Sequence, residues 1–247
     1  MPSPLHCFLY FCQMATISVI QNKLINPLQQ YLEKIDLRTD FLRVDIEFKK
    51  LHQQYPHYFE ELAEELELKW TSFLEKNLIF SFDLLNLQPT DYHLFFEPEY
   101  HFNRYRLKTL RNSFYQDIPF FDLQKWKTFC RSKEKEAFKG GLTHEIWTNP
   151  LAEKLLNKAD EPGYFGGNGS SGWKLHAIAN FCLDLYCKQN KIKFYRLTPY
   201  DSFMWQSKIE LLGNSLKLRR HEKPIQLMIS RKIGYQIPQD ENKDELS

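Results

Sequence analysis

The chain of 247 residues is 43% apolar and 15% aromatic, which is enough for one large domain and excludes a globally disordered protein. Its formal net charge of +2 excludes a chain that is strongly acidic or strongly basic as a whole. The local distribution of charge is therefore the more informative property.

Apolar runs and cysteines indicate where the protein resides. The longest apolar run near the start, Cys7–Cys12, is far shorter than the ~20 residues that a membrane-spanning helix needs. We expect no membrane partner, and we interpret residues 1–14, which contain no Lys or Arg, as a disordered leader. The five cysteines form no C-x-x-C pair, which indicates reduced thiols and a cytoplasmic protein.

Residues 15–77 predict a helical region. Apolar residues three or four apart favour a helix over 17–37, in which Pro27 could begin a second helical segment. A clearer helix is predicted over 57–76, with a solvated outer face rich in glutamate. Its expected inward residues are Phe59, Leu62, Leu66, Trp70 and Phe73.

Residues 39–51 fit two structures. Val44 and Ile46 alternate with charged residues, as they would in a half-buried strand. An apolar face with helical spacing is equally possible, formed by Phe41, Val44, Phe48 and Leu51. We favour a helix, because the flanking segments are helical and no turn signal interrupts the run.

Residues 78–238 predict a mixed α/β domain with a small sheet. Short apolar runs indicate strands at 78–83, 92–96 and 192–197. Helical patterns occur at 101–116, 122–139, 150–160, 173–188 and 200–212. A closing hairpin is predicted from 216–219 and 225–229, before an acidic tail at 239–247. The expected fold class is α+β, mixed and helix-rich.

The most distinctive segment is Gly167-Asn168-Gly169-Ser170-Ser171-Gly172, which matches the pattern G-x-G-x-x-G. Backbone N–H groups at a helix N-terminus can cradle a phosphate. The dinucleotide-binding motif should follow an apolar strand, however, and no such strand precedes this loop. We favour a flexible connection. The alternative is an anion-binding loop formed by Gly167, Gly169 and Gly172, with Lys174 and His176 as its catalytic partners, in a small-molecule or nucleotide-dependent transferase.

Basic charge is concentrated in two segments. Residues 104–139 hold ten basic and four acidic side chains, and residues 185–238 hold eleven and three. Aromatic residues are interspersed, and cations beside rings suit contact with the backbone and bases of DNA or RNA. The predicted nucleic-acid-binding residues are Arg104, Arg106, Lys108, Arg111, Lys217, Arg219, Arg220 and Lys223.

Carboxylates at predicted strand ends suggest metal-assisted chemistry. The candidate catalytic carboxylates are Asp83, Glu97, Glu99 and Asp201, of which Asp83 and Glu97 are the predicted metal ligands. Such groups could hold Mg²⁺ for hydrolysis of a phosphodiester. No clear D-x-n-E-x-K pattern accompanies them.

Three functions remain open from the sequence. The favoured one is a nucleic-acid-binding or nucleic-acid-processing protein, in which the carboxylates would make it a metal-assisted nuclease. The second is the transferase built around the glycine-rich loop at 163–172. The third is a non-enzymatic protein that binds a partner through its N-terminal amphipathic helices.

Overall fold

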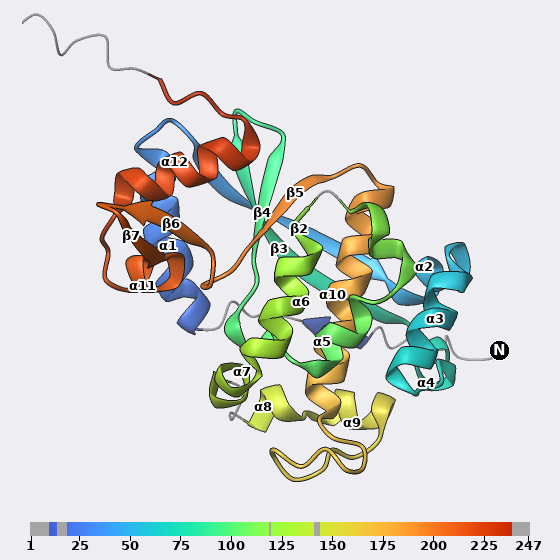
Figure 1. Cartoon of the computed structure of the whole chain (residues 1–247). Coiled ribbons are helices and arrows are strands. Elements are labelled where there is room, and N and C mark those ends of the chain that lie inside the picture. Colours follow the sequence, from blue (N-terminus) through green and yellow to red (C-terminus); the bar gives the residue numbers. More distant parts are fainter. Residues whose placement is uncertain (1–9, 14–18, 119, 141–143, 239–247) are drawn as a thin grey trace, which may run out of the picture. The chain divides into compact units, whose positions relative to one another are not determined.

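A computed structural model describes residues 10–13, 19–118, 120–140 and 144–238 (Figure 1). Most of the expected leader and the acidic tail lie outside the described residues. Tyr10–Gln13, within the expected leader, form strand β1. Among the described residues, no helix is long and apolar enough to cross a membrane.

The chain forms two compact units that interleave along the sequence. Unit 1 comprises residues 1–16, 43–83 and 98–192, and unit 2 comprises residues 17–42, 84–97 and 193–247. The domain boundary predicted between residues 77 and 78 falls inside unit 1.

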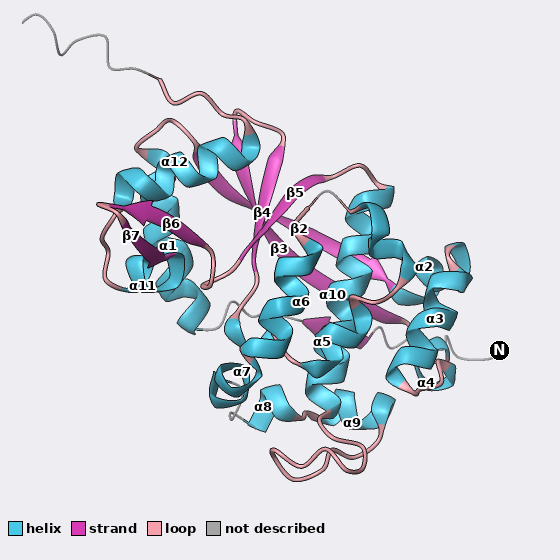
Figure 2. Ribbon diagram, viewed as in Figure 1, coloured by secondary structure: helices cyan, strands magenta, loops and turns pink. Residues whose placement is uncertain are grey.

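The strands confirm a mixed α+β fold (Figure 2). One sheet contains β1, β2 (Arg38–Glu47), β3 (Leu78–Gln88), β4 (Tyr92–Phe96) and β5 (Lys193–Leu197). β1 runs parallel to the start of β3, β4 is antiparallel to its end, and β5 is parallel to β4. A separate antiparallel hairpin consists of β6 (Ser202–Trp205) and β7 (Lys208–Leu211).

Helices dominate the described residues, as expected for a helix-rich fold. Unit 1 contains α2 (Phe48–Gln54), α3 (Pro56–Leu66), α4 (Thr71–Leu74), η1 (Glu99–His101), α5 (Arg104–Thr109), η2 (Ser113–Asp117), α6 (Leu123–Ser132), α7 (Glu134–Gly140), α8 (His144–Trp147), α9 (Pro150–Leu156) and α10 (Ser171–Gln189). Unit 2 contains α1 (Val19–Glu33), α11 (Leu212–Lys217) and α12 (Glu222–Ile233).

The core of unit 1 is aromatic and surrounds the buried helix α10. All five inward residues predicted for 57–76 are buried. The predicted single helix is nevertheless divided into α3 and α4, because Glu67 adopts a left-handed conformation at the end of α3. The redirected chain lets the Trp70 indole donate a hydrogen bond to the Phe59 carbonyl at 2.8 Å.

The helix predicted for residues 39–51 is wrong over most of its length. Residues 38–47 form β2, which pairs with β3, and α2 begins only at Phe48. Val44 and Ile46 are buried, whereas Phe41 and Leu42 are 45% and 39% exposed. The alternating pattern was thus the correct signal. β2 pairs with β3, which begins at residue 78. The helices that flank β2 in the sequence therefore give no information about this pairing.

The core of unit 2 joins α1, α11 and α12 to the ends of three strands. It contains Leu28 from α1, Leu94 from β4, Leu197 from β5, Leu216 from α11 and Ile229 from α12. Pro27 lies inside one continuous helix and begins no second segment.

Two predictions for the C-terminal region are wrong. Residues 200–212 form mainly the β6–β7 hairpin, and the predicted hairpin at 216–229 is instead the end of α11 and the start of α12. The left-handed residues Arg219 and His221 turn the chain between these two helices.

Candidate nucleic-acid interface

The four predicted nucleic-acid-binding residues of the first basic segment all pair with acidic side chains within unit 1. Three of these ion pairs are Arg104 with Glu134 at 2.8 Å, Lys108 with Glu67 at 3.0 Å, and Arg111 with Glu65 at 3.1 Å. Two of these partners belong to the glutamate-rich face predicted to be solvated. A phosphate would have to replace an existing partner at each of these cations.

Arg106 belongs to the interior of unit 1. Its side chain is 1% exposed and its Nη2 lies 2.9 Å from the Oδ2 of Asp184, which is itself fully buried. The Tyr115 hydroxyl donates to the same carboxylate oxygen at 2.6 Å. In this position the guanidinium offers no surface to a nucleic acid.

The glycine-rich loop between α9 and α10 is held by its own hydrogen bonds. The Gly169 amide donates to the Asp160 carboxylate at 2.6 Å, and the Asp160 amide donates to the Gly169 carbonyl at 2.8 Å. Ser170 caps α10 by accepting from the Trp173 amide at 3.0 Å. The Asn168 side-chain amide donates to the carbonyls of Leu156, Asn157 and Lys158. The Asp160 carboxylate thus already accepts the hydrogen bond of an N–H group that a bound phosphate would need.

The other two glycines of the predicted anion-binding loop are also packed against the chain. A Cβ at Gly167 would lie 3.0 Å from Asp160 Oδ2, and one at Gly172 would overlap the Ile146 carbonyl oxygen. The absence of a side chain at Gly167 and Gly172 therefore lets Asp160 and the Ile146 backbone pack closely against the loop.

The Gly172→Ala substitution is expected to lower the free energy of unfolding by about 1–3 kcal/mol, because the added methyl group meets rigid backbone. The backbone atoms that it would meet belong to Ile146 and Trp147. Urea denaturation measures the change. Gly166→Ala is the matched control, because the nearest atoms there belong to the exposed ring of Tyr164, which can move. Equal stability of the two variants would contradict the packing role of Gly172.

The four candidate catalytic carboxylates lie in different surroundings. Glu97 is fully buried and 3.0 Å from Arg196, and Asp201 is 1% exposed. Both belong to unit 2, whereas Asp83 and Glu99 are half-buried residues of unit 1. Within the described residues, no group of three or more His, Cys, Asp or Glu side chains is placed to hold a metal ion. The Mg²⁺ site at Asp83 and Glu97 stays a prediction.

Lys174 and His176 lie near the start of α10. Lys174 Nζ donates to Asn168 Oδ1 at 2.8 Å, and partial burial lowers the pKa of Lys174. The His176 ring packs 5.5 Å from the Tyr100 ring and 5.3 Å from the His101 ring. Burial, with a smaller contribution from His101, lowers the pKa of His176 to about 3. His176 is therefore neutral at pH 7 and cannot attract an anion by charge.

Among the predicted nucleic-acid-binding residues, those of the second basic segment differ, because Arg219 and Lys223 form no ion pair with a described residue. Arg220 lies 3.4 Å from Glu210, and Arg196 is buried with Glu97. Lys217 is exposed. The exposed cations of this segment that form no ion pair with any described residue are Lys191, Lys208, Arg219, Lys223 and Arg231.

Two of these cations line a groove between β6 and α12, which we call the hairpin groove. Lys223 and Arg231 lie eight residues apart on α12, or about 12 Å along the helix axis. The groove encloses about 640 Å³. Its apolar lining comes from Phe203, Met204, Trp205, Pro224, Leu227 and Met228.

The hairpin exposes large apolar side chains beside this groove. The strand register places Met204 opposite Ile209 and Trp205 opposite Lys208, so each pair shares a face of the hairpin. Met204 is 63% exposed, Ile209 73% and Trp205 39%. An exposed indole therefore lies at a site lined by two cations that have no acidic partner in the described part of the chain.

Residues 57–218 match a family model described as a family of unknown function, DUF7255. The chain belongs to this family. No curated protein and no solved structure is significantly similar to it. The matched residues include the β6–β7 hairpin but not α12, so they contain one wall of the hairpin groove.

The sequence prediction identified Lys223 but missed Trp205 and Arg231. It assigned residues 200–212 to a helix, which concealed the hairpin. The available signal was the apolar run Phe203–Trp205 followed, after two residues, by the alternating polar and apolar residues of Lys208–Leu211.

Proposed function

We propose that this protein binds single-stranded nucleic acid at the hairpin groove of unit 2. The observation that carries the proposal is the exposed Trp205 beside Lys223 and Arg231, which have no acidic partner among the described residues. Cations attract the phosphate backbone, and an aromatic face stacks on any base. Stacking on an indole requires an unpaired base, which favours a single strand over a duplex.

Charge supports the same surface. Lys208 lies opposite Trp205 on the hairpin, and Arg219 is exposed just before α12. Neither has an acidic partner among the described residues. The residues that line the groove include no carboxylate, so the proposal concerns binding alone. We propose a cytoplasmic setting, because Cys130, Cys182 and Cys187 are free thiols.

Fluorescence anisotropy with labelled single-stranded DNA and RNA of about 15 nucleotides tests the proposal over a range of salt concentrations. The double substitution Lys223→Glu and Arg231→Glu should weaken binding tenfold or more and reduce the salt slope by about 1.4, at ~0.7 for each lost phosphate contact. Trp205→Ala should weaken binding by about 1–3 kcal/mol, and Trp205→Phe by less.

The matched control changes the same amount of charge in unit 1. Lys135 and Lys158 are exposed and make no ion pair with a described residue. If Lys135→Glu with Lys158→Glu weakens binding as much as the groove variant does, the effect is general attraction and the proposed site is wrong. Absence of binding to any oligonucleotide at low salt would contradict the function itself.

A second candidate function is binding of a protein partner through an acidic, amphipathic segment of that partner. Ile209 and Leu218 are 73% and 62% exposed, and aliphatic side chains do not stack on bases. The N-terminal helices are less suited to docking than this surface, because their apolar residues Leu24, Leu28 and Phe59 are buried. Ile209→Ser should leave oligonucleotide binding unchanged but weaken binding of such a peptide.

A further inference from the structure

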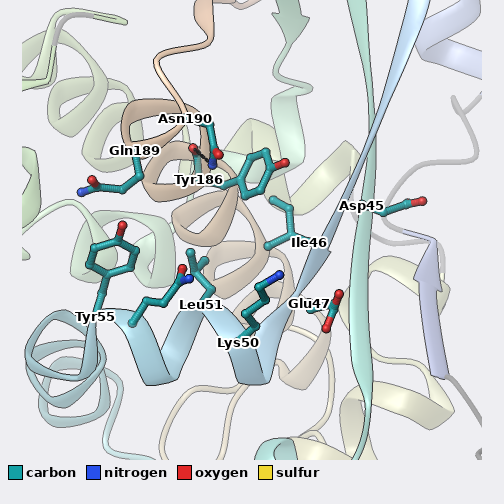
Figure 3. A pocket seen from close by; sticks show the side chains of 10 residues that line it. Asp45, Ile46, Glu47, Lys50, Leu51, Tyr55, Tyr186, Gln189 and Asn190 are labelled. Carbon is teal, nitrogen blue, oxygen red and sulfur yellow. Dashed lines mark hydrogen bonds between the residues drawn. The ribbon is translucent and has the colours of Figure 1, made fainter.

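A second concave site lies in unit 1 (Figure 3). It encloses about 450 Å³ between the end of β2, the helix α2 and the C-terminal end of α10. We call it the polar pocket. Its volume is within the range of small-molecule sites, and it lies in a different unit from the hairpin groove.

Three charged side chains line this pocket, Asp45, Glu47 and Lys50, of which Asp45 pairs with Arg43 at 3.2 Å. Glu47 and Lys50 are both exposed, and neither forms an ion pair with a described residue. Figure 3 shows the Lys50 side chain extending from α2 toward Ile46 of β2. Lys50 and Glu47 are thus one cation and one carboxylate of the lining that a ligand could engage separately.

The uncharged lining supplies an apolar floor and polar walls. Ile46 and Leu51 are 1% and 4% exposed and form the apolar part. Tyr55 and Tyr186 are half-buried, so each offers part of a ring. Side-chain amides come from Gln54, Gln189 and Asn190.

The end of α10 adds a fixed electrostatic contribution. The helix has 19 residues, and its C-terminal end, at Gln189 and Asn190, lies at the pocket. The carbonyl end of a helix carries a partial negative charge, which favours a cation nearby. This end is therefore suited to an ammonium group, whereas Lys50 is suited to a carboxylate.

We propose that the polar pocket binds a free α-amino acid with an apolar side chain. The ligand carboxylate pairs with Lys50, and its ammonium group faces Glu47. Its side chain rests on Leu51, beside the rings of Tyr55 and Tyr186. The site is independent of nucleic-acid binding.

Isothermal titration calorimetry with L-phenylalanine tests the pocket directly, with two analogues that each lack one charge. N-acetyl-L-phenylalanine has no ammonium group, and L-phenylalanine methyl ester has no carboxylate. The amino acid should bind, and both analogues should bind at least tenfold more weakly. Equal binding of either analogue would overturn the dipolar ligand class, and absence of binding by L-phenylalanine, L-leucine and L-methionine would overturn the site.

Charge-neutralising variants give a second readout with a defined sign. Glu47→Gln and Lys50→Gln should each weaken binding roughly three- to tenfold, because each removes one charge contact of the ligand. Lys49→Gln and Glu64→Gln are matched controls, since both residues are exposed and neither lines the pocket. A purely cationic ligand would instead bind Lys50→Gln more tightly, which would overturn the proposal.

Discussion

Replacing Asp184 by alanine is expected to lower the free energy of unfolding of unit 1 by about 3–5 kcal/mol. The carboxylate is fully buried and accepts hydrogen bonds from Arg106 at 2.9 Å and from Tyr115 at 2.6 Å. Its removal takes away the carboxylate that pairs with the Arg106 guanidinium, which is 1% exposed. A buried cation that loses a carboxylate partner keeps the cost of its lost hydration but loses the attraction that offsets it.

Urea denaturation followed by tryptophan fluorescence measures this loss. Four of the five tryptophans are buried in unit 1, so their emission reports on that unit: Trp70, Trp126, Trp147 and Trp173. Asp91→Asn is the control, because the ion pair of Asp91 with Lys193 is exposed and should contribute little.

A double substitution distinguishes the effect of losing a charge from the effect of losing side-chain volume. Arg106→Met with Asp184→Leu removes both charges and keeps apolar volume at both positions. It should be markedly more stable than Asp184→Ala, because no buried charge is left alone. If the double variant is as unstable as the single one, shape and not charge accounts for the loss.

Acid is expected to destabilise unit 1 through His176. Burial lowers the pKa of His176 to about 3 in the folded protein, compared with 6.5 for an ordinary histidine. Between these values the unfolded chain binds a proton that the folded protein does not. Stability is therefore fully retained above pH 6.5 and falls by up to about 1.4 kcal/mol per pH unit as the pH drops toward 3.

The His176→Phe variant tests this contribution, because it keeps a ring at the position but cannot be protonated. Tyr100 and His101, both of η1, face the ring, and neither changes in the variant. The free energy of unfolding should fall less steeply with acid in the variant than in the original protein between pH 6 and pH 4. Parallel pH profiles would show that His176 is protonated without penalty in the folded state.

Local patterns predicted much of the secondary structure correctly. The apolar spacing of Phe59, Leu62 and Leu66 placed one face of α3 in the core. The long buried helix at 171–189 was also predicted, over 173–188. Such features depend on residues within a few positions of one another, so a short window of sequence contains the signal.

The candidate site was predicted only in part. The sequence indicated a basic segment that includes Lys223, but it could not distinguish this cation from Arg106 or Lys108. The distinction depends on partners at 184 and 67, which are far away along the chain. Formal charge counts treat all cations alike, whereas pairing and burial decide which of them a ligand can reach.

The sequence by itself determined the helix-rich α+β class, the buried face of α3 and the presence of two basic segments. Only the tertiary structure decided that residues 38–47 form a strand, that the glycine-rich loop binds its own Asp160, and that the groove joins Trp205 to Arg231. The physical reason is the sequence separation over which each kind of interaction acts. Periodicity and capping act between near neighbours, whereas strand pairing, ion pairing and burial join residues that only the folded chain brings together.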